Sequence, residues 1–387
     1  MTDLIIEQAR AYFDALVKSR FIEMFGTVRD NNLSLPIMKM GDIVEIRNGR
    51  DYKTIQNDNG KYPVYGTGGI ITHADDYLCP ENTVIIGRKG TINNPILVKE
   101  KFWNVDTAFG IICDQNVLNP IYYFWFCKQY DFTQHNKATT IPSLVKADLQ
   151  KISVIVPDKE RQDEFASFVK QVDKSKVIFE KEVARYDDLI KSRFIEMFGP
   201  YFDDDKCSSL GSLCDTFVDG DWIESKDQDE SGIRLIQTGN IGIGTYLNKV
   251  ERARFINEDT FVRLNCTEVF PGDVLISRLP DPLARSCIVP EGLGKTITGV
   301  DCTIIRFGKK INPVFFNQYT LIDHYLSQIT TFEAGSTRKR ISRKNLGKIK
   351  IPVPPIDLQN KFTSFVEQVD KSKLMLFESL KNIAPNN

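Results

Sequence analysis

The same helical phrase occurs twice in this chain. LVKSRFIEMFG at Leu16–Gly26 returns as LIKSRFIEMFG at Leu189–Gly199, an offset of 189 − 16 = 173 residues. A second pair has a different offset, because FVKQVDKSK at Phe168–Lys176 returns as FVEQVDKSK at Phe365–Lys373, and 365 − 168 = 197. Two repeated helical stretches therefore bracket two longer blocks of dissimilar sequence, which predicts two divergent domains on a constant helical frame.

The central copy of the repeat predicts one long amphipathic helix. Residues 158–198 contain no proline or glycine, and apolar side chains recur every three or four positions. Pro157 precedes this stretch and Gly199-Pro200 follows it, as expected at helix boundaries. A helix of this length spans roughly 60 Å at 1.5 Å per residue, which favours a spacer paired with a partner helix.

The partner helices are predicted at the two ends of the chain. Residues 356–379 repeat the first half of the central helix, and residues 4–25 repeat its second half. The terminal segments are thus a split copy of the central element. We predict that they pair with it as an antiparallel coiled coil, in a circularly permuted arrangement with a pseudo-two-fold axis.

The two blocks between the helices predict an α+β fold with mostly antiparallel sheet. Both are rich in β-branched and aromatic residues and are punctuated by Gly, Asn-Gly and Pro turns. The predicted segments are an N-terminal helix at 1–33, a first block at 34–157, the central helix at 158–202, a second block at 203–354 and a C-terminal helix at 355–387.

Composition excludes several classes of protein. The 50 Lys+Arg nearly cancel the 51 Asp+Glu, so any nucleic-acid site must be sought in local charge. The eight cysteines form no CxxC pair and only three histidines accompany them, which disfavours a zinc site and favours reduced thiols. Neither a signal peptide nor a membrane span is predicted, and we expect a cytoplasmic protein.

Motifs that imitate catalytic signatures have simpler interpretations. Asn119-Pro120-Ile121-Tyr122 resembles an amino-methyltransferase motif, but the matching Asn312-Pro313 favours a structural helix start in each block. Residues 239–244, GNIGIG, are better explained as a turn between strands than as a dinucleotide site. Asp106 and Asp301 occupy equivalent places, and we expect each to be a buried hydrogen-bonding group. No catalytic residue and no metal site is predicted.

Local charge is the positive signal. Seven cations and no acid occur between Gly335 and Lys350, a pattern suited to phosphate oxygens, and residues 138–146 align with the start of this run. Arginine, glutamine and asparagine in the block turns could read base edges. The predicted DNA-binding residues of the first block are Arg47, Asn48, Arg50, Lys53, Arg88, Lys89, Thr139, Thr140, Ser143 and Lys146. Those of the second block are Gln237, Thr238, Asn240, Arg278, Arg285, Ser336, Thr337, Arg338, Lys339, Arg340 and Arg343.

This layout resembles the specificity subunit of type I restriction–modification systems. The resemblance rests on TTIPSLVKADLQKISVIVP and GSTRKRISRKNLGKIKIPVPPIDLQ, each followed by a helix, and on the turns IRLIQTGNIG and FPGDVLISR. It implies two target-recognition domains that each read one half of a split double-stranded DNA sequence, and helices that dock two copies of a methyltransferase subunit. It implies no cofactor on this chain: the partners would bind S-adenosylmethionine, and ATP with Mg where a restriction subunit joins.

Two other classes of function stay open from the residues alone. One is a DNA methyltransferase or nuclease that acts without partners. The other is a tandem-repeat scaffold that binds only protein, which predicts no salt-sensitive association with DNA.

Overall fold

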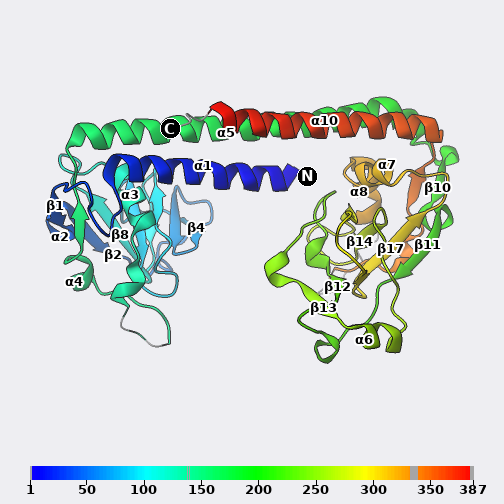
Figure 1. Cartoon of the computed structure of the whole chain (residues 1–387), viewed down its shortest axis with the longest axis horizontal. Coiled ribbons are helices and arrows are strands. Elements are labelled where there is room, and N and C mark those ends of the chain that lie inside the picture. Colours follow the sequence, from blue (N-terminus) through cyan, green and yellow to red (C-terminus); the bar gives the residue numbers. More distant parts are fainter. Residues whose placement is uncertain (1, 137, 139, 332–338, 384–387) are drawn as a thin grey trace. The chain divides into compact units, whose positions relative to one another are not determined.

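The structure is a computed structural model that describes residues 2–136, 138, 140–331 and 339–383. The chain forms two compact units (Figure 1). The first unit is Gln8–Phe179, and the second unit is Met1–Glu7 together with Glu180–Asn387. Both mix helices and sheets, which confirms the predicted α+β class. The boundaries between the two units fall within the helices α1 (Thr2–Phe25) and α5 (Lys159–Phe198). They therefore do not test the division into five segments, which stays a prediction.

The first unit contains a four-stranded antiparallel sheet in the order β2-β8-β5-β6 and a three-stranded sheet in the order β4-β3-β7. A short pair, β1-β9, closes the block. Besides α1 and α5, the elements are β1 (Ile37–Lys39), α2 (Met40–Ile43), β2 (Val44–Asn48), β3 (Tyr62–Gly66), β4 (Gly69–Ala74), β5 (Thr83–Gly87), β6 (Ile96–Val98), β7 (Trp103–Asn104), β8 (Ala108–Cys113), α3 (Pro120–Gln129), α4 (Lys146–Leu149) and β9 (Ser153–Ile155).

The second unit repeats this topology. Its sheets have the orders β11-β17-β14-β15, β13-β12-β16 and β10-β18, and only β12-β16 and, in the first unit, β3-β7 are parallel among the described pairs. The elements are β10 (Cys207–Ser209), β11 (Cys214–Asp219), β12 (Ile233–Ile236), β13 (Arg254–Ile256), α6 (Glu258–Arg263), β14 (Val274–Ser277), β15 (Ser286–Ile288), β16 (Thr296–Thr298), β17 (Cys302–Phe307), α7 (Pro313–Tyr319), α8 (Asp323–Thr330), α9 (Arg343–Leu346), β18 (Lys350–Pro352) and α10 (Ile356–Ile383).

Each unit contains an antiparallel pair of helices, as the split repeat predicts. In the first unit α1 runs beside the first part of α5 (Figure 1), and Arg20 pairs with Glu164 at 3.1 Å. In the second unit α10 runs beside the second part of α5, and the amine of Lys373 lies 2.7 Å from Asp187. The central helix is unbroken through both units because no proline or glycine interrupts residues 159–198.

The repeated phrase supplies the aromatic core under each unit. In the first unit Phe21 stacks on Tyr122 of α3 at 5.5 Å between ring centroids, and it meets Phe165 of α5 edge-on at the same distance. Phe25 contacts the same two rings. All four residues are essentially inaccessible to solvent. Such aromatic pairs stabilise a core beyond the area that they bury.

The second unit builds the same cluster from the second copy of the phrase. Phe194 stacks on Phe315 of α7 at 5.3 Å, and Phe198 meets Phe315 edge-on at 4.7 Å. Phe362 of α10 contacts both phenylalanines of the phrase. The phrase is therefore present twice because each block packs on its helix pair through these rings.

A buried glutamine ties the start of a long helix to each block. The amide oxygen of Gln162 in α5 accepts a hydrogen bond from the Asn119 N–H, and its amide nitrogen donates to the carbonyls of Val117 and Pro157. Gln359 in α10 makes the matching bonds with the Asn312 N–H and with the carbonyls of Lys310 and Pro354. Asn119 and Asn312 cap α3 and α7, so their predicted role as helix starts is confirmed.

We predict that Gln359→Leu weakens the second unit locally. The substitution leaves the Asn312 N–H and two carbonyls buried without a partner, at a cost of about 2 kcal/mol or more. Hydrogen exchange at the Asn312 amide should accelerate roughly 30-fold. The control is Gln368→Leu, the same change at an exposed position of α10, which should leave this amide unaffected. Equal protection in the two variants would show that the glutamine does not tie the helix to the block.

Candidate nucleic-acid interface

The predicted residues of the first block gather at one end of the four-stranded sheet. Because the strands are antiparallel, β2 and β5 end where β8 begins, with Asn48 opposite Phe109 and Gly87 opposite Ala108. The β3 strand of the second sheet ends beside the same place, since the Val105 N–H donates to the Tyr65 carbonyl. We call this edge, with the loops that leave it, the loop end of the unit.

Backbone hydrogen bonds hold three separate segments together at the loop end. The Arg50 N–H donates to the Asn104 carbonyl at 3.0 Å, and the Arg88 N–H donates to the Thr107 carbonyl at 2.8 Å. The Leu144 N–H donates to the Arg88 carbonyl at 2.9 Å. Residues from 48–53, 88–90 and 140–146, which are far apart in sequence, are thus neighbours in space.

The side chains of these residues differ in their exposure to solvent and in the bonds that they make within the unit. Asn48, Arg50, Lys53, Lys89 and Thr140 are exposed, and Arg88, Ser143 and Lys146 are half-buried. Arg47 is engaged within the unit, because it donates to the Leu78 carbonyl at 2.7 Å and pairs with Glu45. Thr139 lies outside the described residues.

A glycine shapes the turn that carries Asn48 and Arg50. The Gly49 N–H donates to the Ala108 carbonyl, and a Cβ at this position would lie 1.8 Å from the carbonyl oxygen of Val105. The turn can approach the next loop this closely only without a side chain. The second unit repeats the arrangement at Gly220, whose N–H donates to the Cys302 carbonyl and whose Cβ would lie 2.4 Å from the Thr298 oxygen.

The loop end of the second unit is therefore equivalent, residue by residue, to that of the first. Asp219 takes the place of Asn48, Arg278 that of Arg88, and Ile341 that of Leu144, since the Ile341 N–H donates to the Arg278 carbonyl. It follows that Arg340 corresponds to Ser143 and Arg343 to Lys146.

Two predicted arginines of the second block donate hydrogen bonds to backbone carbonyls of their own unit. The guanidinium of Arg285 donates to four backbone carbonyls, those of Thr238, Ile241, Leu279 and Pro282. Arg278 has a side chain only 7% exposed, donates to the Val300 carbonyl and lies 3.4 Å from Asp219. Burial lowers the pKa of both arginines below their ordinary value.

The polar turn after β12 is also partly structural. Asn240 is buried, accepts from the Gln237 N–H and donates to the Leu247 carbonyl. The side chains of Gln237 and Thr238 are half-buried beside it. This segment is a turn between strands, as the sequence predicts, and the side chains of Gln237 and Asn240 form a capping box at its start.

The cationic run divides into an undescribed and a described part. Ser336, Thr337 and Arg338 lie outside the described residues, whereas Lys339 and Arg340 are exposed. Arg340 pairs with Asp301 at 2.9 Å, and Arg343 lies 3.7 Å from Asp219 and donates to the Phe217 carbonyl. The expectation that Asp106 and Asp301 are buried is wrong, because Asp106 is exposed and Asp301 is half-exposed beside its arginine. The loops that carry them leave the sheet edge toward solvent.

Sequence reasoning missed several apolar residues at the loop end. Trp222, two residues after Gly220, is 70% exposed, and Ile70 and Ile71 are exposed just after the tight turn at Gly66–Gly69. The GTGG turn flanked by two isoleucines is a signal that could have identified the second pair. The sequence around Trp222 offers no such signal, because one tryptophan after a strand is equally typical of a core.

The acidic side chains and the thiols of the described residues bear on possible metal and nucleophile chemistry. No group of three or more His, Cys, Asp or Glu among them could hold a metal ion. Burial raises the pKa of the Cys79, Cys113 and Cys214 thiols to about 12 and that of Cys266 to about 11, so these thiols stay protonated near neutral pH. Every helix in the described part of the chain is too short or too polar to cross a bilayer.

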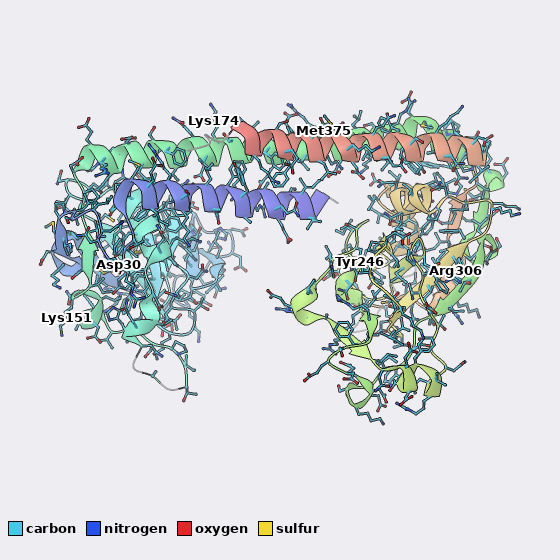
Figure 2. The ribbon with its side chains drawn as sticks, in the orientation of Figure 1. Asp30, Lys151, Lys174, Tyr246, Arg306 and Met375 are labelled. Carbon is cyan, nitrogen blue, oxygen red and sulfur yellow. The ribbon has the colours of Figure 1, made fainter. Side chains whose placement is uncertain are left out.

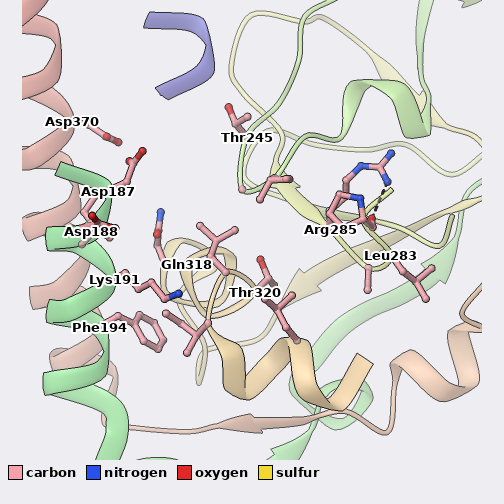
Figure 3. A pocket seen from close by; sticks show the side chains of 18 of the residues that line it. Asp187, Asp188, Lys191, Phe194, Thr245, Leu283, Arg285, Gln318, Thr320 and Asp370 are labelled. Atoms are coloured by element: carbon pink, nitrogen blue, oxygen red, sulfur yellow. Dashed lines mark hydrogen bonds between the residues drawn. The ribbon is translucent and has the colours of Figure 1, made fainter. Parts of the chain in front are cut away.

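A cavity of about 560 Å³ lies in the second unit between the helix pair and α7–α8 (Figure 3). Asp187, Lys191 and Phe194 of α5 line one side, and Leu283 and Thr320 belong to the other side. Lys373 is 2% exposed and is neutralised by Asp187 and by Asp370 at 3.1 Å. The charge of Lys373 is thus balanced by acids of the same wall, and among the predicted residues that the structure describes only Arg285 lines this cavity.

Two copies of one fold, each presenting exposed cations and polar side chains at its loop end, define a two-module recognition protein. The chain belongs to the family of type I restriction modification DNA specificity domains, whose model matches residues 36–185 and again residues 204–383. Its role is therefore DNA recognition within a type I restriction–modification system.

The chain is also similar in sequence or in fold to known proteins of type I restriction systems. The chain is 19% identical over 374 residues to the specificity subunit of the type I restriction enzyme MjaVIII of Methanocaldococcus jannaschii, covering 86% of this chain and 85% of the relative. It is 17% identical over 373 residues to the specificity subunit of the EcoDI enzyme of Escherichia coli, covering 86% and 80%. A solved structure, described as the basis of complex assembly and conformational transition of the type I R-M system, shares the fold with a TM-score of 0.52 and 17% identity, covering 91% of this chain and 95% of that chain.

We predict that Gly49→Ala destabilises the first unit by about 3 kcal/mol, because the added Cβ collides with the Val105 carbonyl and forces the turn away. Calorimetric unfolding of the full chain measures the effect. Gly68→Ala is the matched control, since a Cβ there meets nothing within 4 Å, and its unfolding should differ little from that of the wild type. Equal stability of the two variants would contradict the close approach at Gly49.

Proposed function

We propose that each unit reads one half of a bipartite DNA sequence through its loop end, and that the chain itself carries no active site. The observation that supports this most directly is that the same sheet edge in both units gathers exposed cations and amides from segments distant in sequence. Two modules on one continuous helix also raise the effective concentration of each module for its half-site once the other is bound.

The exposed residues divide naturally between two tasks. Arg50, Lys53 and Lys89 in the first unit, and Lys339, Arg340 and Arg343 in the second, are suited to backbone phosphates, which supply affinity without sequence information. Asn48, Gln237 and Thr238 are suited to base edges. Arg47, Asn240, Arg278 and Arg285 serve by holding the loops in shape, because each donates a side-chain hydrogen bond to a backbone carbonyl of its own unit.

We propose that the helix pairs bind two copies of a methyltransferase subunit, which carries S-adenosylmethionine and modifies the DNA. A restriction subunit with ATP and Mg would join in a complete system, and the site of action would be the cytoplasm, where the DNA lies. Exposed apolar side chains on the helices support a protein-binding role. Val177 and Ile178 are half exposed on α5, and Met375 of α10, labelled in Figure 2, is 69% exposed.

We predict that exchanging residues 34–157 for the corresponding block of another specificity subunit changes one half of the recognised sequence and leaves the other half unchanged. The reason is that the first unit has its own core and its own loop end. Mapping of methylated bases in a host that carries the chimera and its partner subunit is the measurement. The reciprocal exchange of residues 203–354 is the control, and it should alter only the other half. A change in both halves, or in neither, would contradict the modular proposal.

We also predict that the purified chain transfers no methyl group from labelled S-adenosylmethionine to mixed duplex DNA. Transfer should begin only when a methyltransferase subunit is added. Methylation by the chain alone would establish an enzyme in its own right. Absence of any salt-sensitive DNA association, even with the partner present, would instead favour a scaffold that binds only protein.

A further inference from the structure

Five charged side chains meet at the loop end of the second unit. Asp219 ends β11, Arg278 follows β14, Asp301 precedes β17, and Arg340 and Arg343 come from the segment that closes the block. We call these residues the arginine–aspartate cluster. The Arg278 N–H donates to the Asp301 carbonyl, and the Ile341 N–H donates to the Arg278 carbonyl, so the backbone fixes the three loops to one another.

The cluster has an inner and an outer layer. The inner guanidinium of Arg278 is buried, and its Nε lacks a hydrogen-bond partner although Asp219 lies 3.4 Å away. The outer side chains of Arg340 and Arg343 are 48% and 42% exposed. Asp301 pairs with one terminal nitrogen of Arg340, and Asp219 lies beside Nε of Arg343. A guanidinium has five N–H donors, so an ion pair through one nitrogen leaves donors for a second anion.

The charges of the cluster do not cancel. Three arginines against two aspartates leave one excess positive charge, which a phosphodiester, with its single negative charge, would neutralise. The equivalent positions of the first unit are Asn48, Arg88, Thr107, Ser143 and Lys146, since the Arg88 N–H donates to the Thr107 carbonyl as the Arg278 N–H donates to the Asp301 carbonyl. There two cations face no acid, so two acids and one cation are absent together and the excess is two positive charges.

The ion pair between Arg340 and Asp301 is absent as a pair from the first unit, which is a second observation. Arg340 is replaced by neutral Ser143 and Asp301 by neutral Thr107, so neither partner is kept without the other. Asp219 is replaced by neutral Asn48 where Arg343 is replaced by Lys146. The simplest physical account is that the acids accompany the arginines because they hold them in position.

We propose that the arginine–aspartate cluster binds one phosphodiester of the DNA backbone through Arg340 and Arg343, and that Asp219 and Asp301 are the positioning residues that pre-form this site. The inference rests on the proposed DNA-reading function and deepens it. The acids fix the long arginine side chains before DNA arrives, which lowers the rotamer entropy lost on binding. They also fix which donors face the anion. The contact is sequence-independent, because it reaches only the backbone.

Salt dependence of binding to a labelled 30-base-pair duplex of random sequence tests the outer layer. The full chain with its methyltransferase partner is used. Arg340→Gln should weaken binding equally for all sequences and reduce the slope of log Kobs against log[salt] by about 0.9, the value for one lost phosphate contact. Arg340→Lys, which keeps the charge, should restore most of the slope. An unchanged slope in Arg340→Gln would overturn the proposal.

The positioning role of Asp301 is tested by whether Asp301→Asn strengthens or weakens DNA binding. Asp301→Asn removes a negative charge near DNA, so plain electrostatics predicts tighter binding. A positioning role predicts the opposite, a loss of about threefold or more, because Arg340 is no longer held. Asp259→Asn, at an exposed acid of α6, is the control for the change in net charge and should not weaken binding. Tighter binding by Asp301→Asn would overturn the positioning role.

A further arm distinguishes the DNA backbone from a free anion. Inorganic phosphate and sodium chloride at equal ionic strength should release the duplex equally if the site takes a phosphodiester within the larger contact. Selective release by phosphate from the wild type, but not from Arg340→Gln, would assign the site to the free anion and overturn the DNA contact. Absence of salt-dependent binding in the wild type itself would refute the proposed function rather than this site.

Discussion

The rest of each unit depends on one aromatic junction between its block and its helices. In the first unit two phenylalanines of the repeated phrase pack against Tyr122 and Phe165, and in the second they pack against Phe315 and Phe362. Aromatic rings bury a large apolar area, and this burial stabilises the packing of each block on its helix pair. A glutamine buried next to each junction adds three hydrogen bonds between the helix and the block, so that the backbone groups it meets are satisfied.

This junction explains how the two recognition surfaces could diverge. The junction lies on one side of the block, among α3 or α7 and the helices, whereas the loop end is built from the turns after β2, β5 and their equivalents. Substitutions in those turns leave the aromatic core untouched. The position of Asn48 in the first unit holds Asp219 in the second, and the position of Ser143 holds Arg340. The glycine turn and the backbone hydrogen bonds are the same in both units. The loop end thus varies in charge at constant geometry.

Most of the frame could be predicted from the sequence. The central helix, its split copies, the capping asparagines and the α+β blocks all follow from local signals such as a 3.6-residue period, the absence of proline and an Asn-Pro pair. The burial of Asp106 and Asp301 was wrongly predicted, because exposure of a loop depends on the path that neighbouring strands impose. Trp222 was missed for the same reason. The undescribed Thr139, Ser336, Thr337 and Arg338 stay predictions.

The sequence by itself determined that two related domains are carried on a repeated helical frame, because repetition and periodicity are properties of neighbouring residues. Only the tertiary structure decided which cations are available to a ligand. Arg285 and Arg340 have the same side-chain chemistry, yet Arg285 is bonded to four carbonyls while Arg340 stays half exposed beside one aspartate. The partners that make this difference lie up to 47 residues away in the chain. Hydrogen bonds of that range form only once the sheet has brought distant loops to a common edge.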